Sequence, residues 1–314
     1  MSQPSFIPRR TFLAGAAVAG LALPAVASSS IKSSKPSLIC FSKHLQFSRD
    51  YNELADLLAD LGYDGADLTV RRGGHVLPEN VERDLPKAVD AIRKVGLDVQ
   101  MITSDISDPD DPKTERVLKT ASALGIPYYR IGTWQYEKNR PIMEQLDEYK
   151  PRLKKLAAMN EEYKIRAGYH NHSGQNYIGG SMWDLYEIYK EVDPQWVGYN
   201  YDAAHAIAEG SAGSWETTYQ LIQDRIFGVA VKDCAWMRDP QKGWRRTYPP
   251  VGEGMVNWPY VLQLLKKTNF TGPFSMHFEY DIPGEGAEKR KNELQCIRRD
   301  FNQFQTWLRE AGMR

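Results

Sequence analysis

Residues 54–70 read LADLLADLGYDGADLTV, a helical pattern that stops at a glycine and leads into a strand. The leucines recur at three- and four-residue intervals up to Leu61, which is the spacing of one buried helix face. Gly62 follows directly and suits the left-handed residue that ends many helices. The short apolar run Gly65–Val70 then has the length and composition of a buried strand.

The same alternation of strand and helix recurs along the chain. Gly96 and Gly125 again end helical patterns just before a strand, and a long charged helix is predicted at Ala287–Ala311. The other strand-like runs are Ser37–Phe41, Leu97–Thr103, Ile126–Ile131, Ile165–Tyr169, Trp196–Tyr201, Ile226–Val231 and Pro273–Phe278. Eight strand–helix units favour a single α/β domain, a (β/α)8 TIM barrel over residues 37–314. No strand opens a GxGxxG or Walker loop, which disfavours an open doubly wound sheet.

Residues 1–27 are expected to be a signal peptide. Arg9-Arg10 precede an apolar run that ends at Leu23, too short to span a bilayer, and Ala25-Val26-Ala27 form a small-residue cleavage site. The paired arginines followed by Thr-Phe-Leu resemble a twin-arginine signal, which predicts export to the periplasm or the medium. A Sec signal or an uncleaved anchor is the alternative. Cleavage would leave residues 28–36 as a flexible segment, and no stable membrane span.

Charge and cysteine content narrow the class of protein. Without Arg9 and Arg10, 38 basic residues face 40 acidic ones, a balance that predicts no nucleic-acid partner. The three scattered cysteines form no CxxC motif and are too few and too odd in number for a disulfide framework. The oligomeric state stays open, a homo-oligomer included.

The histidines gather at strand ends. Each closes or follows a strand-like run, and none lies in a stretch with a helical pattern; they are His44, His75, His170, His172, His205 and His277. The carboxyl ends of TIM-barrel strands carry the catalytic groups, so we expect these imidazoles to converge on one pocket. Imidazole suits both metal ligation and proton transfer near neutral pH. Capping of strands or pairing with carboxylates is the alternative for any one of them.

Charged side chains occupy the same strand ends. They are Arg71, Asp202, Lys232 and Glu279. Alternation along a strand puts His170 and His172 on the same side. A mixed set of imidazoles and carboxylates suits one Zn²⁺, Mn²⁺, Co²⁺ or Mg²⁺ ion with open positions. Buried ion pairs between the acidic and basic groups are the alternative.

These strand endings, from Ser37 to Tyr280, resemble the xylose isomerase-like TIM barrel superfamily of sugar isomerases and epimerases. In that superfamily a divalent metal is typically held by Glu on strand five, Asp on strand six, His on strand seven and Glu on strand eight. Asp202 matches this pattern, whereas His170 and His277 stand at the two glutamate positions and Ala230 at the histidine position.

The resemblance implies a divalent metal site formed by His170, Asp202 and His277. Replacing two carboxylates by neutral imidazoles lowers the negative charge of such a site by two. This change favours zinc or another softer ion, or no metal, over manganese or magnesium.

The expected activity is abstraction of a proton α to the carbonyl of a small sugar or keto-sugar. Glu279 and His205 are the candidate acid and base, and Lys232 would stabilise the developing enediolate oxygen. The residues expected to contact the substrate are His44, Arg71, His75, His172 and Trp236. Isomerisation, epimerisation and β-elimination stay open as outcomes.

Two other classes of function stay open. A non-catalytic carbohydrate-binding or partner subunit would explain the missing ligand at Ala230. DNA-lesion endonuclease chemistry also occurs on this barrel, but the predicted export and the balanced charge argue against it.

Overall fold

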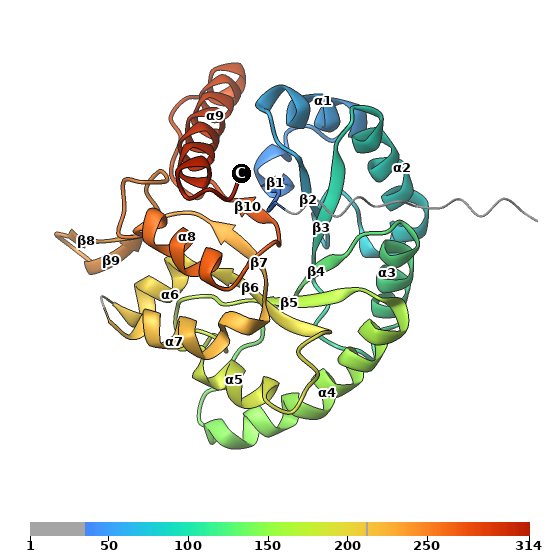
Figure 1. Ribbon diagram of the computed structural model, residues 1–314, viewed down its shortest axis with the longest axis vertical. Helices are drawn as coiled ribbons and strands as arrows, with labels where there is room; N and C mark the ends of the chain where they lie inside the picture. Colours follow the sequence, from blue (N-terminus) through green and yellow to red (C-terminus); the bar gives the residue numbers. More distant parts are fainter. Residues whose placement is uncertain (1–34, 212) are drawn as a thin grey trace, which may run out of the picture. The chain divides into compact units, whose positions relative to one another are not determined.

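Residues 35–211 and 213–314, described by a computed structural model, form one closed barrel of parallel strands surrounded by helices (Figure 1). The strands follow the order β1-β10-β7-β6-β5-β4-β3-β2 around the barrel. The predicted fold class, a single-domain (β/α)8 TIM barrel, is confirmed.

The barrel strands start and end within two residues of the predicted runs. They are β1 (Leu38–Phe41), β2 (Gly65–Val70), β3 (Asp98–Ser104), β4 (Tyr128–Ile131), β5 (Arg166–His170), β6 (Val197–Asp202), β7 (Ile226–Val231) and β10 (Phe274–Met276). The hydrophobic runs therefore locate every strand of the barrel, because each strand of a parallel barrel is buried on both faces.

The helices alternate with these strands and form the outer layer (Figure 1). They are α1 (Tyr51–Leu61), α2 (Val81–Lys94), α3 (Pro112–Ala123), α4 (Ile142–Tyr163), α5 (Trp183–Tyr189), α6 (Ala203–Gly210), α7 (Ser214–Ile222), α8 (Trp258–Lys267) and α9 (Gly286–Glu310), with 3-10 turns η1 (Ser42–Leu45), η2 (Pro78–Asn80) and η3 (Gln223–Arg225). Asp50 caps α1 by accepting from the backbone N–H of Asn52 and Glu53, and Gly62 ends it at φ 88°.

Side chains alternate between the helix layer and the barrel interior. On β4, Tyr129 and Ile131 join the apolar core shared with the helices, so Arg130 points into the barrel. At the amino-terminal end, the Arg166 guanidinium lies 6.0 Å from the ring centre of Tyr128 and 5.5 Å from that of Phe227. Packed side chains thus fill the amino-terminal end of the barrel interior, and the polar side chains collect at the carboxyl-terminal end.

Two local features differ from the sequence-based expectations. His44 lies in η1 and His205 in α6, so the expectation that no histidine lies in a helix is wrong. The Asp202 carboxylate accepts from the His205 N–H, which starts a helix immediately after β6. An antiparallel hairpin, β8 (Ala235–Asp239) and β9 (Gly243–Thr247), follows β7 and was not predicted.

The predicted signal peptide and the segment up to residue 34 lie outside the described residues. Within the part of the chain that is described, no helix has the length and apolar composition needed to cross a membrane.

Candidate active site at the carboxyl ends of the strands

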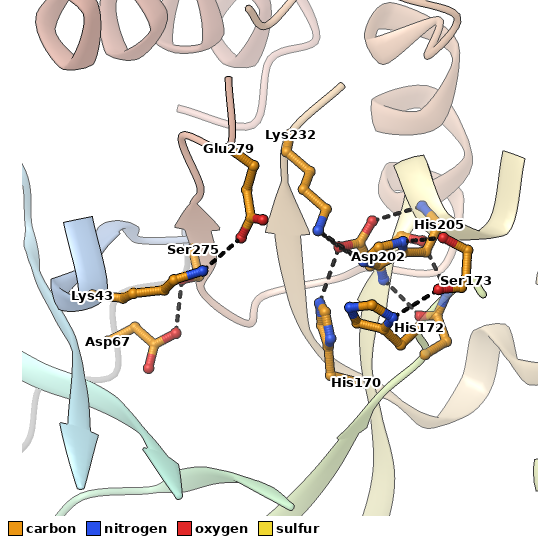
Figure 2. Close-up of polar contacts among 11 residues, drawn as sticks. Lys43, Asp67, His170, His172, Ser173, Asp202, His205, Lys232, Ser275 and Glu279 are labelled. Carbon is orange, nitrogen blue, oxygen red and sulfur yellow. Dashed lines mark hydrogen bonds and ion pairs between the residues drawn. The ribbon is translucent and has the colours of Figure 1, made fainter. Parts of the chain in front are cut away.

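Asp202, at the end of β6, is the centre of a fully buried polar cluster (Figure 2). Its Oδ2 accepts from His170 Nε2 at 3.0 Å and pairs with Lys232 Nζ at 3.2 Å. Burial favours the neutral acid, but the neighbouring His205 and Lys232 hold the pKa of Asp202 below its usual value. The carboxylate is therefore ionised at neutral pH.

Lys232 and His205 share a hydrogen bond that defines the state of the imidazole. Lys232 Nζ lies 2.8 Å from His205 Nε2, and Ser173 Oγ lies 2.6 Å from His205 Nδ1. An ammonium group can only donate, so Nε2 accepts and Nδ1 carries the proton towards Ser173. Burial, reinforced by the Lys232 charge, holds the pKa of His205 well below its ordinary value. His205 is therefore a neutral group that orients Lys232.

His172 lies against this cluster and is more open. Its ring centre is 4.1 Å from that of His205 and 4.5 Å from that of Tyr177. His172 Nδ1 lies 2.8 Å from the Ser173 carbonyl oxygen, which fixes the proton on Nδ1. Burial and the Lys232 charge lower the pKa of His172. Nε2 is left with an accessible lone pair, the arrangement required of a general base.

A second cluster joins β1 and β10. Glu279 Oε1 pairs with Lys43 Nζ at 3.3 Å, and His44 Nε2 accepts from the Phe278 N–H at 3.1 Å. The buried His277 Nε2 has no hydrogen-bond partner among the described residues. Burial would raise the pKa of Glu279, but nearby lysines, Lys43 among them, hold it below the ordinary value. Figure 2 shows Lys43 and Glu279 on one side of Lys232, and Asp202 with the histidines around it on the other.

Asp67 forms the floor of the site. It is fully buried and accepts from Thr103 Oγ1 and Ser275 Oγ, each at 2.8 Å. Burial raises its pKa to about 6, although the two hydroxyl groups and the charges of Arg130 and Arg71 act in the opposite direction. Its neutral form is therefore accessible near physiological pH.

Asp233 positions the neighbouring Lys232. Asp233 accepts from the N–H of Gly252 at 2.9 Å and of Val256 at 3.0 Å. A Cβ at Gly254 would lie 2.1 Å from Asp233 Oδ1, so the loop approaches the carboxylate as closely as a glycine allows. The glycine-containing turn 251–254 thus secures the segment that carries Lys232.

Most of the predicted site residues lie in two adjoining groups, since the rings of His170 and His277 stack with their centres 5.9 Å apart. The structure brings His170, His172, Asp202, His205 and Lys232 together, with His44, His277 and Glu279 in the second cluster. His75 lies apart, bonded to Thr69 Oγ1 at 3.1 Å and to the Ser48 carbonyl at 3.1 Å. Trp236 is on β8, and its Nε1 donates to the Ala208 carbonyl at 3.2 Å. His75 thus links β2 to the segment before α1, and Trp236 links β8 to α6.

Two groups of side chains place three ligand atoms within 4.8 Å of one another, as a metal site requires: His170, Asp202 and His205, and His44, His277 and Glu279. The expected set of His170, Asp202 and His277 is thus divided between them. In the first group an ion on Asp202 Oδ2, at about 2.1 Å, would lie within about 5 Å of the Lys232 ammonium. At an effective dielectric constant of about 20, the two would repel by about 6 kcal/mol or more.

The second group is no better suited to an ion. The lone pair of His44 Nε2 is taken by the Phe278 N–H, and Glu279 is paired with Lys43. This leaves fewer than the three free protein ligands that catalytic zinc sites usually have. As placed, the residues of neither group fit a divalent cation.

A closed barrel with polar groups at the carboxyl ends of its strands defines an enzyme-type TIM barrel. Residues 55–300 match the model of the xylose isomerase-like TIM barrel family, and the chain belongs to that family. An uncharacterized protein of Methanocaldococcus jannaschii is 26% identical over 136 residues, which are 43% of this chain and 44% of that protein. The chain thus matches less than half the length of this curated relative.

Solved structures of other proteins share the fold at low sequence identity. D-psicose 3-epimerase of Clostridium cellulolyticum has a TM-score of 0.65 at 11% identity, covering 87% of this chain and 99% of that one. The 3-keto-D-glucoside 4-epimerase YcjR of E. coli has a TM-score of 0.64 at 13% identity, covering 87% and 100%. A Mycobacterium smegmatis xylose isomerase-like protein in complex with magnesium has a TM-score of 0.59 at 18% identity, covering 80% and 89%.

Three residues of the site, Arg130, Ser173 and Tyr248, were not among the sequence-based candidates. Arg130 is the one charged residue in its apolar run, a signal that could have marked it as inward-facing. Ser173 and Tyr248, whose ring centre is 4.9 Å from Lys232 Nζ, lie in loops and carry no such pattern.

Proposed function

We propose that this protein is an isomerase-type enzyme that removes a proton α to the carbonyl of a keto-sugar, with Lys232 as the electrophile. The observation that carries the proposal is the buried Lys232 ammonium, held by Asp202 and His205 between two groups able to accept a proton. None of the proposed proton-transfer steps uses a metal ion.

Lys232 has one hydrogen left for a substrate. An ammonium group carries three donors, of which one bonds to Asp202 Oδ2 and one to His205 Nε2. The third has no oxygen or nitrogen partner among the described residues. Directed at a substrate carbonyl, it would stabilise the negative charge that develops on that oxygen when the α-proton leaves.

Glu279 and His172 are the candidate bases on either side of Lys232. The base takes the α-proton, and the electron pair of the C–H bond moves into an enolate whose oxygen bonds to Lys232. Return of a proton to the opposite face gives the epimer, and its return to the neighbouring carbon, with movement of the hydroxyl proton, gives the isomer. Loss of a β-hydroxyl group instead would make the enzyme a lyase.

The family and its neighbours support a sugar ligand. Two structures of the same fold are a ketose 3-epimerase and an epimerase of a 3-keto-glucoside, both of which act beside a carbonyl carbon. Export through a twin-arginine signal, and with it a periplasmic or secreted location, rests on residues 1–27 alone. The proposal therefore includes a sugar encountered outside the cytoplasm.

Solvent deuterium incorporation tests the reaction. Keto-sugars, including D-psicose, D-tagatose and a 3-keto-D-glucoside, are incubated with the protein in D₂O and followed by NMR. We expect deuterium at a carbon next to the carbonyl of at least one sugar. Loss of water with exchange would indicate the lyase. Sugar binding without exchange in any compound would favour the non-catalytic alternative and refute the proposal.

Variants identify the groups. Lys232→Met/Asp202→Asn removes both buried charges together and should lower the rate of deuterium exchange by about 100-fold or more. Lys119→Met, at an exposed position on α3, is the control and should leave the rate unchanged. Glu279→Gln and His172→Gln distinguish the two bases, since loss of a general base costs about 100-fold or more.

A further inference from the structure

Arg130 is an inward-facing arginine without a protein partner. On β4 its neighbours in register are Thr103 of β3 and Gly168 of β5, so it lies in the wall of the barrel interior. Its side chain makes no hydrogen bond or ion pair in the described part of the chain. None of its nitrogens is among the buried atoms that lack a partner, and the residue is only partly buried.

Arg71 lies close to Arg130 and likewise has no acidic partner among residues 35–211 and 213–314. It follows β2, and its guanidinium lies 5.5 Å from the ring centre of Phe41. The charges of Arg130 and Arg71 both oppose the rise in the pKa of Asp67, and the pKa of Arg130 is lowered by burial and by the nearby charge of Arg71. Two like charges are thus held together at the rim of the site.

The acidic groups nearby do not neutralise this pair of arginines. Asp202 is paired with Lys232 at 3.2 Å, and Glu279 with Lys43 at 3.3 Å. Both oxygens of Asp67 are taken by hydroxyl groups, not by guanidinium groups. Asp67 supplies one negative charge when it is ionised but makes no ion pair with either arginine. The site therefore keeps one positive charge in excess and two guanidinium groups outside any ion pair, an arrangement that a bound anion would stabilise.

We propose that Arg71 and Arg130 form an anion-binding subsite across the barrel from Lys232, and that the substrate is a keto-sugar carrying a carboxylate or a phosphate group. The sugar part of this inference rests on the proposed function. A planar guanidinium presents paired N–H donors that match the oxygens of either group, and such charge-assisted bonds are strong.

The subsite also fixes which end of a substrate reaches Lys232. An anionic group held by the arginines of β2 and β4 would direct the remainder of the molecule across the barrel towards β7. Neutral ketoses lack this anchor. We therefore expect the enzyme to discriminate by charge more strongly than by the configuration of individual hydroxyl groups.

Calorimetric titration of the full chain with inorganic phosphate and, separately, with glycolate tests the subsite without any turnover. We expect one-to-one binding of at least one of the two anions, weakened by added salt. Arg130→Gln and Arg71→Gln should each weaken it about tenfold or more. Arg152→Gln, which removes the same charge from the outer helix α4, should leave it unchanged. Arg130→Lys keeps the positive charge but loses the paired N–H donors of the guanidinium. Its affinity for the anion should lie between those of the wild type and Arg130→Gln.

The outcomes separate the two ideas. Binding of phosphate alone indicates a sugar phosphate, and binding of glycolate alone a sugar acid. Binding of neither anion, or equal binding by the wild type and both glutamine variants, overturns the subsite. Anion binding without deuterium exchange in any keto-sugar would leave the subsite standing and refute the proposed reaction. Deuterium exchange into a neutral keto-sugar, by a protein that binds neither anion, would support the proposed reaction and refute the subsite.

Discussion

Substitution of Asp67 by asparagine is predicted to remove a specific pH dependence of stability. Asp67 is fully buried, and burial raises its pKa from 3.8 to about 6. As the pH rises through 4, the carboxyl group ionises in the unfolded chain before it does in the folded barrel. The free energy of unfolding therefore falls over this range, and it becomes level above pH 6, where both states are ionised.

The size of the effect follows from the shift. A change of about two pKa units corresponds to about 3 kcal/mol, at 1.36 kcal/mol per unit. Asp67→Asn cannot ionise, so the wild type loses this amount between about pH 3.5 and pH 7 and the variant does not. Any loss of stability from weaker hydrogen bonds to Thr103 and Ser275 is independent of pH. It shifts the whole curve of unfolding free energy against pH by a constant amount.

Urea denaturation of both proteins, at half-unit pH steps, measures the difference. Asp56→Asn, an exposed carboxyl on α1 with no bonded partner, serves as the matched control for the loss of one acid. The unfolding free energy of Asp67→Asn relative to the wild type should increase with pH by about 3 kcal/mol. A constant difference, or one that falls with pH, would refute the argument that burial dominates at Asp67.

Three further predictions concern the site. Overnight dialysis against EDTA should leave deuterium exchange unchanged, because Lys232 stands beside Asp202 where an ion would bind; loss of exchange restored by a metal would contradict this. Asp202→Ala should destabilise the barrel by about 3–5 kcal/mol in chemical denaturation by leaving Lys232 buried and unpaired, and Lys232→Met/Asp202→Ala should recover part of that loss. Gly254→Ala, whose Cβ would meet Asp233, should lower both the melting temperature and the exchange rate, whereas an unchanged melting temperature would show that the loop moves aside.

The sequence was sufficient for the fold because the strands of a parallel barrel are continuous apolar runs. Gly65–Val70 and Ile226–Val231 were predicted to the residue, and Gly62 takes the left-handed conformation expected of a helix end. The hairpin of β8 and β9 was missed because its residues are mostly exposed, so no buried face imposes an alternating pattern. His205 was misplaced because its helix begins with a single capping bond from Asp202.

The sequence by itself therefore determined the barrel, its family and the end of the barrel at which the polar residues meet. Only the tertiary structure decided how they pair. It placed Lys232 beside Asp202 where a cation would bind and divided the expected metal ligands between two clusters. It also left Arg71 and Arg130 without acidic partners in the part of the chain that it describes. Strand order and alternation follow from local patterns along the chain, whereas pairing depends on distances between side chains that lie far apart in sequence and come together only when the barrel closes.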